Sequence, residues 1–467
     1  MSSSTTTSRT TSLRTTSGRR RTRAGIVAGA TALVLLTAGC SGGTRVGGDA
    51  PEAASGDDAG LGDVTGEIRL AYWGSGSRVD LTNGVSDLFV AENEGVSVTP
   101  EFTDFAAYFQ RLNVQASSGG MACITQLQGR QLNDYAGQGL LLDLQPLVDS
   151  GAIDVSGIPE DVLDTGRGTD GALYEIPYGA AYDAIMVNTT LAEEAGVGSP
   201  ADGWTWQEFF DYARAAQGSL PEGVSGVNLL GGHPNTFIEW LRGRGQEVFE
   251  GTEAAFSADD VVEYWSIWEG LRNDGVTISA PDRAAEAAQV EQSWIAQGRV
   301  MSDNKPGNQI GQAQGAIEGA QPGQELTTVQ LPRGEDGSSS TVLFTSGWSI
   351  PRSCDNVPTA AAYIDFWIND PEANALFASN NGAVTNTEML QAQLDDESLD
   401  PATRQTLELY QEIVEDEPPT VLYPAGYQAN FETAFQRAYE DVALNGADPQ
   451  ATAESFVENL DAALASA

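Results

Sequence analysis

The chain has 467 residues, of which 41% are hydrophobic, and its 66 acidic residues outnumber 23 lysines and arginines to give a formal net charge of −43. A charge of this size repels nucleic acid and anionic lipid surfaces, so we expect neither as a binding partner. The charge favours solubility but does not indicate a fold.

The N-terminal 40 residues show the order of features found in a secretory signal. Four arginines lie between residues 19 and 23, and small and apolar residues then run from Ala24 to Gly39. This stretch is shorter than the roughly 20 apolar residues that a membrane-spanning helix needs. We therefore expect residues 1–40 to be a signal peptide.

The segment Leu36-Thr37-Ala38-Gly39-Cys40 resembles a bacterial lipobox, in which the cysteine becomes the lipidated first residue of the mature protein. Thr37 departs from the pattern, because an apolar residue usually stands at that position. The resemblance implies a lipoprotein signal peptide over residues 1–40, lipidation at Cys40 and attachment at the extracytoplasmic face of the cell membrane. The alternative is an ordinary cleaved signal and a freely secreted protein.

Residues 41–64 consist mainly of Gly, Ala, Ser and Asp. Such a segment cannot bury a hydrophobic core, so we expect it to be a flexible tether. Residues 1–40 hold six arginines and no acidic residue, so the rest of the chain carries 17 basic and 66 acidic residues. The chain that follows the tether is long enough for two domains of ordinary size.

The folded part begins with alternating strand and helix patterns. Residues 68–73 predict a strand, which the glycines at 74–76 end. Apolar residues between Leu81 and Phe89 fall on one helical face, residues 96–99 predict a second strand, and residues 105–112 predict a second helix. This alternation indicates an α/β fold with crossover connections.

Capping residues mark several later helices. Thr205 and Glu208 form a capping-box pattern, and Ser257 precedes another apolar stripe. Asp370 stands at the expected cap of a helix that begins with Pro371, and we expect Gly382 to close that helix. Two more helices are predicted near the C-terminus, at residues 431–442 and 453–460.

Two cysteines, Cys123 and Cys354, remain besides Cys40. An oxidising compartment favours pairing of cysteines. The two residues are 231 positions apart, and the sequence alone does not show whether they approach one another. A disulfide and two buried thiols are both open readings.

The sequence offers little for catalysis. His233 is the single histidine, and neither an activated nucleophile motif nor metal-ligand spacing of Cys and His is present. Calcium-loop and phosphate-loop motifs are also missing, so we expect no metal and no cofactor. With 66 acidic residues, however, chance pairs of carboxylates are numerous, and acid–base hydrolysis of sugars stays open as an alternative.

Aromatic residues outside the helical stripes favour carbohydrate binding. Sugar rings present apolar faces that pack on flat aromatic rings, while their hydroxyls need polar partners. The aromatic candidates are Trp73, Tyr178, Tyr182, Trp348, Tyr423 and Tyr427, and the polar residues near them are Gln128, Arg130, Asn308, Gln309, Asn380 and Asn381.

Four segments, in this order along the chain, resemble the extracellular solute-binding proteins of bacterial ABC importers, in the carbohydrate-binding group. Residues 122–144 resemble the strand, helix and "G-x-L-x-D-L" of that family, and residues 176–196 resemble its crossover segment with "P-Y" and "A-G". Residues 203–210 resemble its "T-W-x-E-F", and residues 347–386 its "F-W" and "N-D-P-E-A" region. Cys123-Ile124 departs from the Pro-Asp that commonly precedes this strand.

The resemblance implies a two-lobe, periplasmic-binding-protein-like (type II) fold with hinge strands and a ligand cleft. Lobe one is expected at 65–180 plus 302–345, and lobe two at 181–301 plus 346–467. Hinge crossings are expected near 179–183, 299–303 and 343–349. A Cys123–Cys354 bridge would then join the lobes and restrain closure.

The implied function is capture of a sugar or oligosaccharide by lobe closure and delivery to the membrane permease subunits, without catalysis. We expect a monomer. A secreted glycoside hydrolase and a non-transport surface sugar receptor are the alternatives. The matched motifs give as expected ligand-binding residues Trp73, Tyr108, Gln128, Arg130, Tyr178, Tyr182, Trp240, Asn308, Gly347, Trp348 and Gly382.

Overall fold

The computed structural model describes residues 62–466. The expected signal peptide, Cys40 and all but the last three residues of the expected tether lie outside the described residues. Among the helices of residues 62–466, none is long and apolar enough to cross a membrane.

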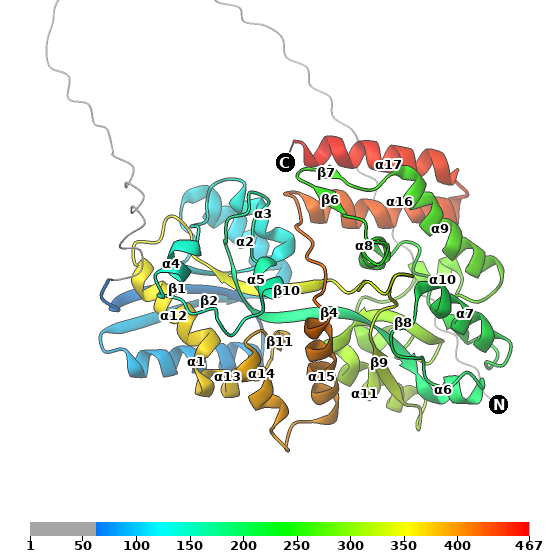
Figure 1. The fold of residues 1–467 in the computed structure, drawn as a ribbon, viewed down its shortest axis with the longest axis horizontal. Helices are drawn as coiled ribbons and strands as arrows, with labels where there is room; N and C mark the ends of the chain where they lie inside the picture. Colours follow the sequence, from blue (N-terminus) through cyan, green and yellow to red (C-terminus); the bar gives the residue numbers. More distant parts are fainter. Residues whose placement is uncertain (1–61, 467) are drawn as a thin grey trace, which may run out of the picture. The chain divides into compact units, whose positions relative to one another are not determined.

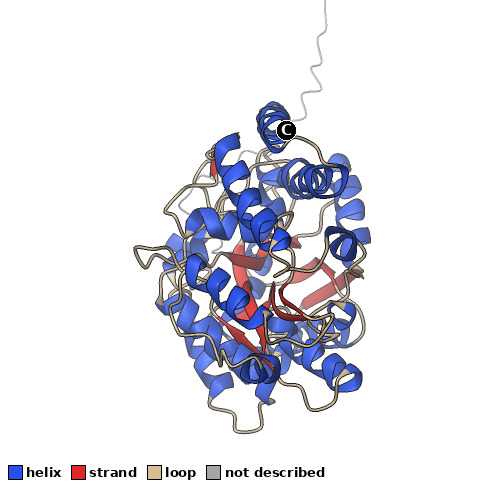
Figure 2. Cartoon of the chain, turned by 90° about the vertical axis from the view of Figure 1, so that its right-hand side faces the viewer, coloured by secondary structure: helices blue, strands red, loops and turns tan. Residues whose placement is uncertain are grey.

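A mixed sheet of nine strands organises the described chain, and helices surround it (Figures 1 and 2). Seven strands lie in the order β2-β1-β3-β10-β4-β8-β5, and β9 and β11 each pair with β4; β6 and β7 form a separate hairpin. The strands are β1 Gly66–Trp73, β2 Val96–Thr103, β3 Ile124–Gln128, β4 Ile176–Asn188, β5 Ser225–Val227, β6 Phe249–Glu250, β7 Glu253–Ala254, β8 Val300–Pro306, β9 Leu326–Val329, β10 Leu343–Ser349 and β11 Ala383–Val384.

Most connections between the strands contain helices, as the alternating sequence pattern predicts. The helices are α1 Ser77–Glu92, α2 Phe105–Ser118, α3 Gly129–Ala136, α4 Gln145–Asp149, α5 Glu160–Asp164, α6 Thr189–Glu194, α7 Trp206–Gln217, α8 Pro234–Arg242, α9 Ala258–Asn273, α10 Ala280–Ala284, α11 Ile310–Ala320, α12 Val357–Asn369, α13 Pro371–Phe377, α14 Thr387–Leu394, α15 Pro401–Glu415, α16 Thr433–Asn445 and α17 Pro449–Leu464. Short 3₁₀ helices are η1 Val290–Gln292 and η2 Gly307–Gln309, and η3 Gln428–Glu432 is a short π-helix.

The predicted α/β class and the helix starts are confirmed. Both halves of the capping box are present at Thr205 in α7, and Ser257 caps α9 in the same way. The Asp370 carboxylate accepts the backbone N–H of Ala373 at 2.8 Å and begins α13. These side chains satisfy N–H groups that the first turn of a helix leaves without partners.

The expectation that Gly382 closes α13 is wrong. The helix ends at Phe377, and Ala378 adopts the left-handed conformation at its C-cap with φ 46°. Gly382 instead precedes β11 with φ 101°, and a Cβ there would lie 2.7 Å from the Ala180 carbonyl oxygen of β4. Close approach of two backbones explains the glycine at this position.

The hydrophobic cores divide the described chain into two parts. One part contains residues 68–184 and 343–413, and the other contains residues 185–342 and 421–464. We call them lobe one and lobe two. β4 carries the first crossing, because Ala184 packs in the first core and Ile185 in the second. Figure 1 shows β4 between elements of both lobes.

This grouping differs from the expected lobe limits. Residues 302–342 pack with lobe two, since Ile310, Ala313 and Ile317 of α11 join its core. Residues 346–413 pack with lobe one, since the apolar face of α12 covers β1 and β4. The crossings accordingly fall at 184–185, 342–343 and 414–421, and residues 299–303 lie wholly within lobe two.

Cys123 and Cys354 form a disulfide. Both residues pack against the core of lobe one. The bridge therefore stays within one lobe, and the expectation that it would join the lobes and restrain closure is wrong. The reason is that the segment after β10 returns to lobe one.

Candidate functional site

Polar side chains from both lobes meet where β4 passes from one core to the other. Asp183 lies on β4 at this crossing, and Asn304 lies on β8, opposite Ile185. α3 and the segment between α15 and α16 supply the remaining side chains. The residues that meet here, which we call the junction cluster, are Arg130, Asp183, Asn235, Glu239, Asn304, Tyr423, Tyr427 and Glu432.

Direct contacts cross between the lobes in the junction cluster. Arg130 of lobe one pairs with Glu432 of lobe two at 3.0 Å, and its guanidinium lies 3.9 Å from the centre of the Phe344 ring. Asn133 of α3 donates to the Tyr423 carbonyl at 2.7 Å. Lobe one and lobe two are thus held together here by charged and polar groups.

Two acidic residues of the cluster, Asp183 and Glu239, are fully buried. Asn235 donates to Asp183 at 2.7 Å, and Asn304 donates to Glu239 at 2.7 Å. Burial raises the pKa of Glu239 well above its ordinary value, and the neighbouring Asp183 carboxylate raises that pKa further. Glu239 is therefore the member of the pair whose protonated form burial and the neighbouring carboxylate both favour.

Two tyrosines, Tyr423 and Tyr427, cover Arg130 with ring centres 4.5 Å apart. Burial raises the pKa of both hydroxyls, and the Glu432 carboxylate raises them further. Burial by itself would lower the pKa of Arg130, but Tyr427 and Glu432 outweigh it and the pKa rises. Arg130 is thus a permanent charge in this site.

A second group of charged residues lies on β8 and its neighbours. Lys305, the single lysine, contacts Asp303 at 3.2 Å and Glu286 at 3.6 Å. Arg283 also pairs with Glu286, and Asn228 donates to Asp303 at 2.9 Å. We call these five residues the lysine cluster.

Electrostatic interactions connect the two clusters. The charges of Arg130 and Lys305 both oppose the rise that burial causes in the pKa of Asp183. His233 adjoins both clusters: burial lowers its pKa well below the ordinary value, and Arg283, Lys305 and Arg130 lower that pKa further. His233 is therefore neutral, and its Nδ1 accepts the Thr236 N–H at the start of α8.

Several polar atoms of this region are buried without a hydrogen-bond partner among the described residues. They include Arg130 Nε, Gln131 Oε1, Asp303 Oδ1, Asn304 Oδ1 and the Tyr423 hydroxyl. Buried polar groups in folded proteins nearly always have partners, because an unpaired one costs about 1–3 kcal/mol. The concentration of such atoms where two lobes meet marks a candidate site for a polar small molecule.

A cavity of about 590 Å³ lies beside this region. Asn133, Asp134 and Tyr135 of α3 line it from lobe one, and the loop 424–426 lines it from lobe two. The Gly426 N–H donates to Asp134 across the boundary at 2.7 Å. The cavity is large enough for a small ligand, although no residue of the two clusters lines it.

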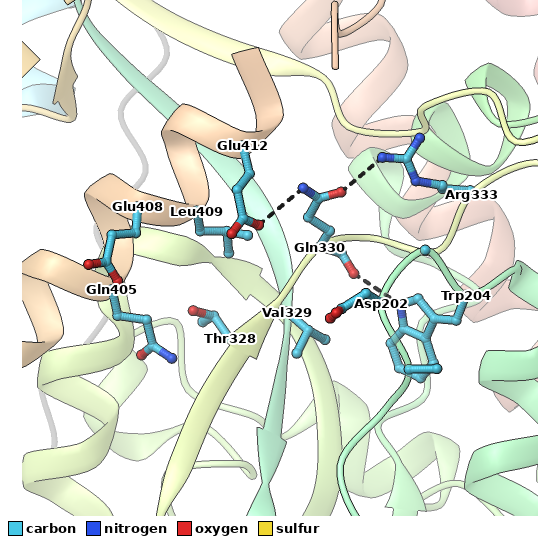
Figure 3. Close-up of a pocket in the computed structure, with 12 residues that line it drawn as sticks. Asp202, Trp204, Thr328, Val329, Gln330, Arg333, Gln405, Glu408, Leu409 and Glu412 are labelled. Carbon is cyan, nitrogen blue, oxygen red and sulfur yellow. Dashed lines mark hydrogen bonds between the residues drawn. The ribbon is translucent and has the colours of Figure 1, made fainter. Parts of the chain in front are cut away.

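A different cavity, of about 440 Å³, lies between α15 and the segments around Trp204 and Gln330 (Figure 3). Its polar groups bind one another: Trp204 donates to the Gln330 carbonyl at 3.1 Å, and Arg333 donates to the Gln330 side chain at 3.3 Å. Gln330 in turn donates to Glu412 at 3.4 Å. These mutual contacts make this cavity a weaker candidate than the clusters.

The sequence model of the family described as bacterial extracellular solute-binding protein matches residues 75–374. The chain belongs to this family. The described part of this solute-binding protein thus has a two-lobe α/β fold, and the family indicates an extracytoplasmic location.

The curated relatives compared with this solute-binding protein share about a quarter of the aligned residues. A binding protein of Brucella abortus (strain 2308) is 26% identical over 221 residues, which are 46% of each chain. This protein therefore spans about half the length of the curated relatives it matches.

Solved structures share the fold over most of the chain. An oligogalacturonide-binding protein of Yersinia enterocolitica gives a TM-score of 0.72 at 17% identity, covering 86% of this chain and 99% of its own. An ABC substrate-binding protein of Listeria monocytogenes in complex with cycloalternan gives a TM-score of 0.67 at 19% identity, with the same coverage.

Among the residues that sequence analysis selected, Arg130 lies in the junction cluster. Gln128 is half-buried and immediately precedes α3, two positions from Arg130. Tyr182 adjoins Asp183 on β4, but its ring is buried under η2 and its hydroxyl donates to the Thr406 carbonyl at 2.7 Å.

Trp73 and Tyr108 belong to an aromatic group at the end of β1. Their ring centres are 5.5 Å apart, and Trp73 also contacts Phe105 and Phe109. Tyr108 is buried and donates to the Gln126 carbonyl at 2.7 Å, whereas Phe105 is 41% exposed. The exposed surface of this group therefore comes from a residue that the sequence analysis did not select.

Tyr178, Gly347 and Trp348 lie inside lobe one. The rings of Tyr178 and Trp348 stack with centres 4.9 Å apart, and Trp348 is 1% exposed. A Cβ at Gly347 would lie 2.4 Å from a side-chain carbon of Glu175, which explains the glycine by packing. These three residues pack inside lobe one. That they contact a ligand stays a prediction.

The remaining selected residues are not brought to the clusters. Trp240 is buried in the core of lobe two, stacked on Phe237, and Arg244 covers its other surface. Asn308 is exposed in η2, and Gly382 lies in the turn before β11. Ligand contacts by these three residues also stay predictions.

The sequence analysis did not select most of the junction and lysine clusters. Tyr423 and Tyr427 were noted as aromatic candidates, but Asp183, Glu239 and Asn304 were not. One signal was available: Asp183 and Asn304 are polar residues within strands that are otherwise apolar. Burial of such residues usually has a reason in hydrogen bonding or ligand contact.

Proposed function

We propose that the protein is the lipid-anchored, substrate-binding component of an ABC importer, and that it captures a sugar or oligosaccharide between its lobes for delivery to the membrane permease. The observation that carries the proposal is the set of buried, unpartnered polar atoms contributed by both lobes at the junction and lysine clusters. Sugar hydroxyls can both donate to and accept from such atoms.

Binding between two lobes couples ligand capture to a change of shape. A ligand that touches both lobes stabilises the closed arrangement by its differential affinity for that state. Arg130 of lobe one already pairs with Glu432 of lobe two, and Asn133 of lobe one donates to Tyr423 of lobe two. A permease that recognises the closed form would thereby distinguish the loaded protein.

Two further observations support a carbohydrate ligand. Solved structures with the same fold include proteins named for binding to oligogalacturonide and cycloalternan. Trp73 and Phe105 also form an aromatic group with an exposed edge in lobe one, of the kind on which sugar rings pack. The anchor rests on the sequence around Cys40, and the mass of the mature N-terminus tests it.

A secreted glycoside hydrolase is the second candidate, because Asp183 and Glu239 are two interacting carboxyl groups whose pKa values burial raises. Such enzymes place their carboxyl groups on opposite sides of the scissile bond. Asp183 and Glu239 instead interact directly with each other. A direct interaction between the two carboxyl groups favours binding over hydrolysis.

Calorimetric titration and thermal unfolding of purified residues 41–467 with a panel of oligosaccharides test the proposal. We expect one ligand to bind stoichiometrically without being hydrolysed. At 100 times its dissociation constant, it should stabilise the folded state by about 2.7 kcal/mol. Turnover of the ligand would instead establish the hydrolase, and a panel without any binding ligand would contradict the carbohydrate assignment.

A further inference from the structure

The charges at the two clusters bear on which sugars the site accepts. Three cationic side chains lie there, and each already contacts a carboxylate. Arg130 pairs with Glu432, Arg283 pairs with Glu286, and Lys305 contacts both Asp303 and Glu286. Each cation of the clusters therefore already has a carboxylate partner, and among the buried N–H groups of these three side chains only Arg130 Nε has no hydrogen-bond partner within the described residues.

The unpartnered atoms are mainly hydrogen-bond acceptors. Gln131 Oε1, Asp303 Oδ1 and Asn304 Oδ1 can only accept, and the Tyr423 hydroxyl can accept or donate. Tyr427 OH and Glu239 Oε1 are also unpartnered and can accept or, when protonated, donate, so Arg130 Nε is the one atom of the set that can only donate. A ligand that satisfies this set must supply mainly donors, as sugar hydroxyls do and as carboxylates do not.

Additional negative charge surrounds the same atoms. Asp183 and Glu239 are buried beside Arg130, and Asp303 and Glu286 lie around Lys305. Besides Glu239, the carboxyl groups of Asp183, Glu286, Asp303 and Glu432 lie among the three cations. Burial raises the pKa of Asp183 and Asp303, so an added anion would make their charged forms still less favourable. An anionic ligand would thus be buried among unfavourable charges without a partner of its own.

We propose that the site selects uncharged, hydroxyl-rich sugars and rejects acidic ones such as uronate oligomers. The proposal rests on the proposed sugar-binding function and names its substrate class. It separates this protein from the neighbour in Yersinia enterocolitica that is named for oligogalacturonide. Arg78 lies outside both clusters and donates to the Asn380 side chain and carbonyl.

The test compares neutral di- and trisaccharides of glucose, mannose and xylose with di- and trigalacturonate by calorimetric titration of residues 41–467. We expect a neutral sugar to bind at least about tenfold more tightly than either galacturonate, a difference of about 1.4 kcal/mol. Tighter binding of a galacturonate would overturn the inference and leave the proposed function standing. No binding by either class would contradict the proposed function itself.

Charge-neutralising variants make the test independent of the panel. Glu432→Gln releases Arg130, and Glu286→Gln releases Arg283, so each variant should reduce the preference for the neutral sugar by about tenfold. Glu263→Gln is the matched control, because it removes the exposed partner of Arg244 outside both clusters and should leave the preference unchanged. Two test variants are used so that the experiment can still be read if one of them fails to fold. An unchanged preference for the neutral sugar in both folded variants would contradict the inference.

Discussion

At the scale of single residues, the junction cluster shows how burial sets protonation. Glu239 and Asp183 are buried together, and the cost of two adjacent charges is avoided when Glu239 keeps its proton. Arg130 stays charged because Tyr427 and Glu432 compensate its loss of hydration. These states depend on neighbours from distant parts of the sequence.

Glu239→Gln should flatten the pH dependence of stability. The raised pKa of Glu239 in the folded state means that its contribution is full below the ordinary pKa and is lost as the pH rises through the raised value. Thermal unfolding between about pH 5 and pH 9 should therefore show a smaller alkaline loss of stability in the variant. Glu247→Gln, an exposed change, should keep the slope of the parent protein.

Trp348→Ala should destabilise the protein by about 3–5 kcal/mol, because it leaves a cavity in the core of lobe one. The Trp348 ring is 1% exposed and packs on Tyr178 and Trp367. Denaturant unfolding measures this loss, and Phe102→Ala, at a residue 45% exposed, is the control with a small effect. A Trp348 variant of unchanged stability that fails to bind sugar would restore Trp348 as a ligand contact.

At the scale of elements, β4 joins the lobes and positions the site. Its residues up to Ala184 pack in one core and those from Ile185 onward in the other. Asp183 stands at this transition. The disulfide lies away from β4, between the start of β3 and the segment after β10.

Replacing Cys123 and Cys354 together by serine should reduce stability by about 2–4 kcal/mol and leave ligand affinity within about twofold. Both cysteines lie in lobe one, so the bridge does not restrain movement between the lobes. Its loss mainly increases the conformational entropy of the unfolded chain. Denaturant unfolding and calorimetric titration of the double variant measure the two quantities. A large change in affinity would indicate that the bridge acts on closure after all.

At the scale of the whole described molecule, contacts between the lobes determine how readily the protein closes. Arg130 bridges to Glu432, and Asp134 accepts from Gly426 across the same boundary. These contacts favour the closed state before ligand binds. The stronger they are, the less of the ligand's binding free energy is needed for closure, and the higher the apparent affinity becomes.

Arg130→Ala should weaken sugar binding by about tenfold or more, because it leaves Glu432 unpaired and removes a contact between the lobes. Small-angle scattering of the variant without ligand should show a larger radius of gyration than the parent protein. Arg244→Ala, which removes an ion pair within lobe two, should change neither quantity. Unchanged affinity in Arg130→Ala would place the ligand elsewhere.

Local patterns predicted much of the fold correctly. Apolar periodicity predicted the first two strand–helix pairs. Short-range hydrogen bonding predicted the capping boxes at Thr205 and Ser257 and the start of α13. Arg130 was also selected from its matched motif. The lobe limits were misplaced, because the crossing at 414–421 depends on which core each helix covers, and short-range patterns do not contain that information.

The sequence by itself determined the α/β class, the absence of recognisable catalytic motifs and the family resemblance that the comparison confirmed. The export signal ending at Cys40 stays a prediction from the same sequence. Only the tertiary structure decided that Cys123 meets Cys354 within one lobe and that Trp348 is a core residue. It also brought Arg130 and Glu432, 302 positions apart, into contact. Burial and the pairing of distant charges depend on how whole elements pack, and that packing is a property of the complete fold.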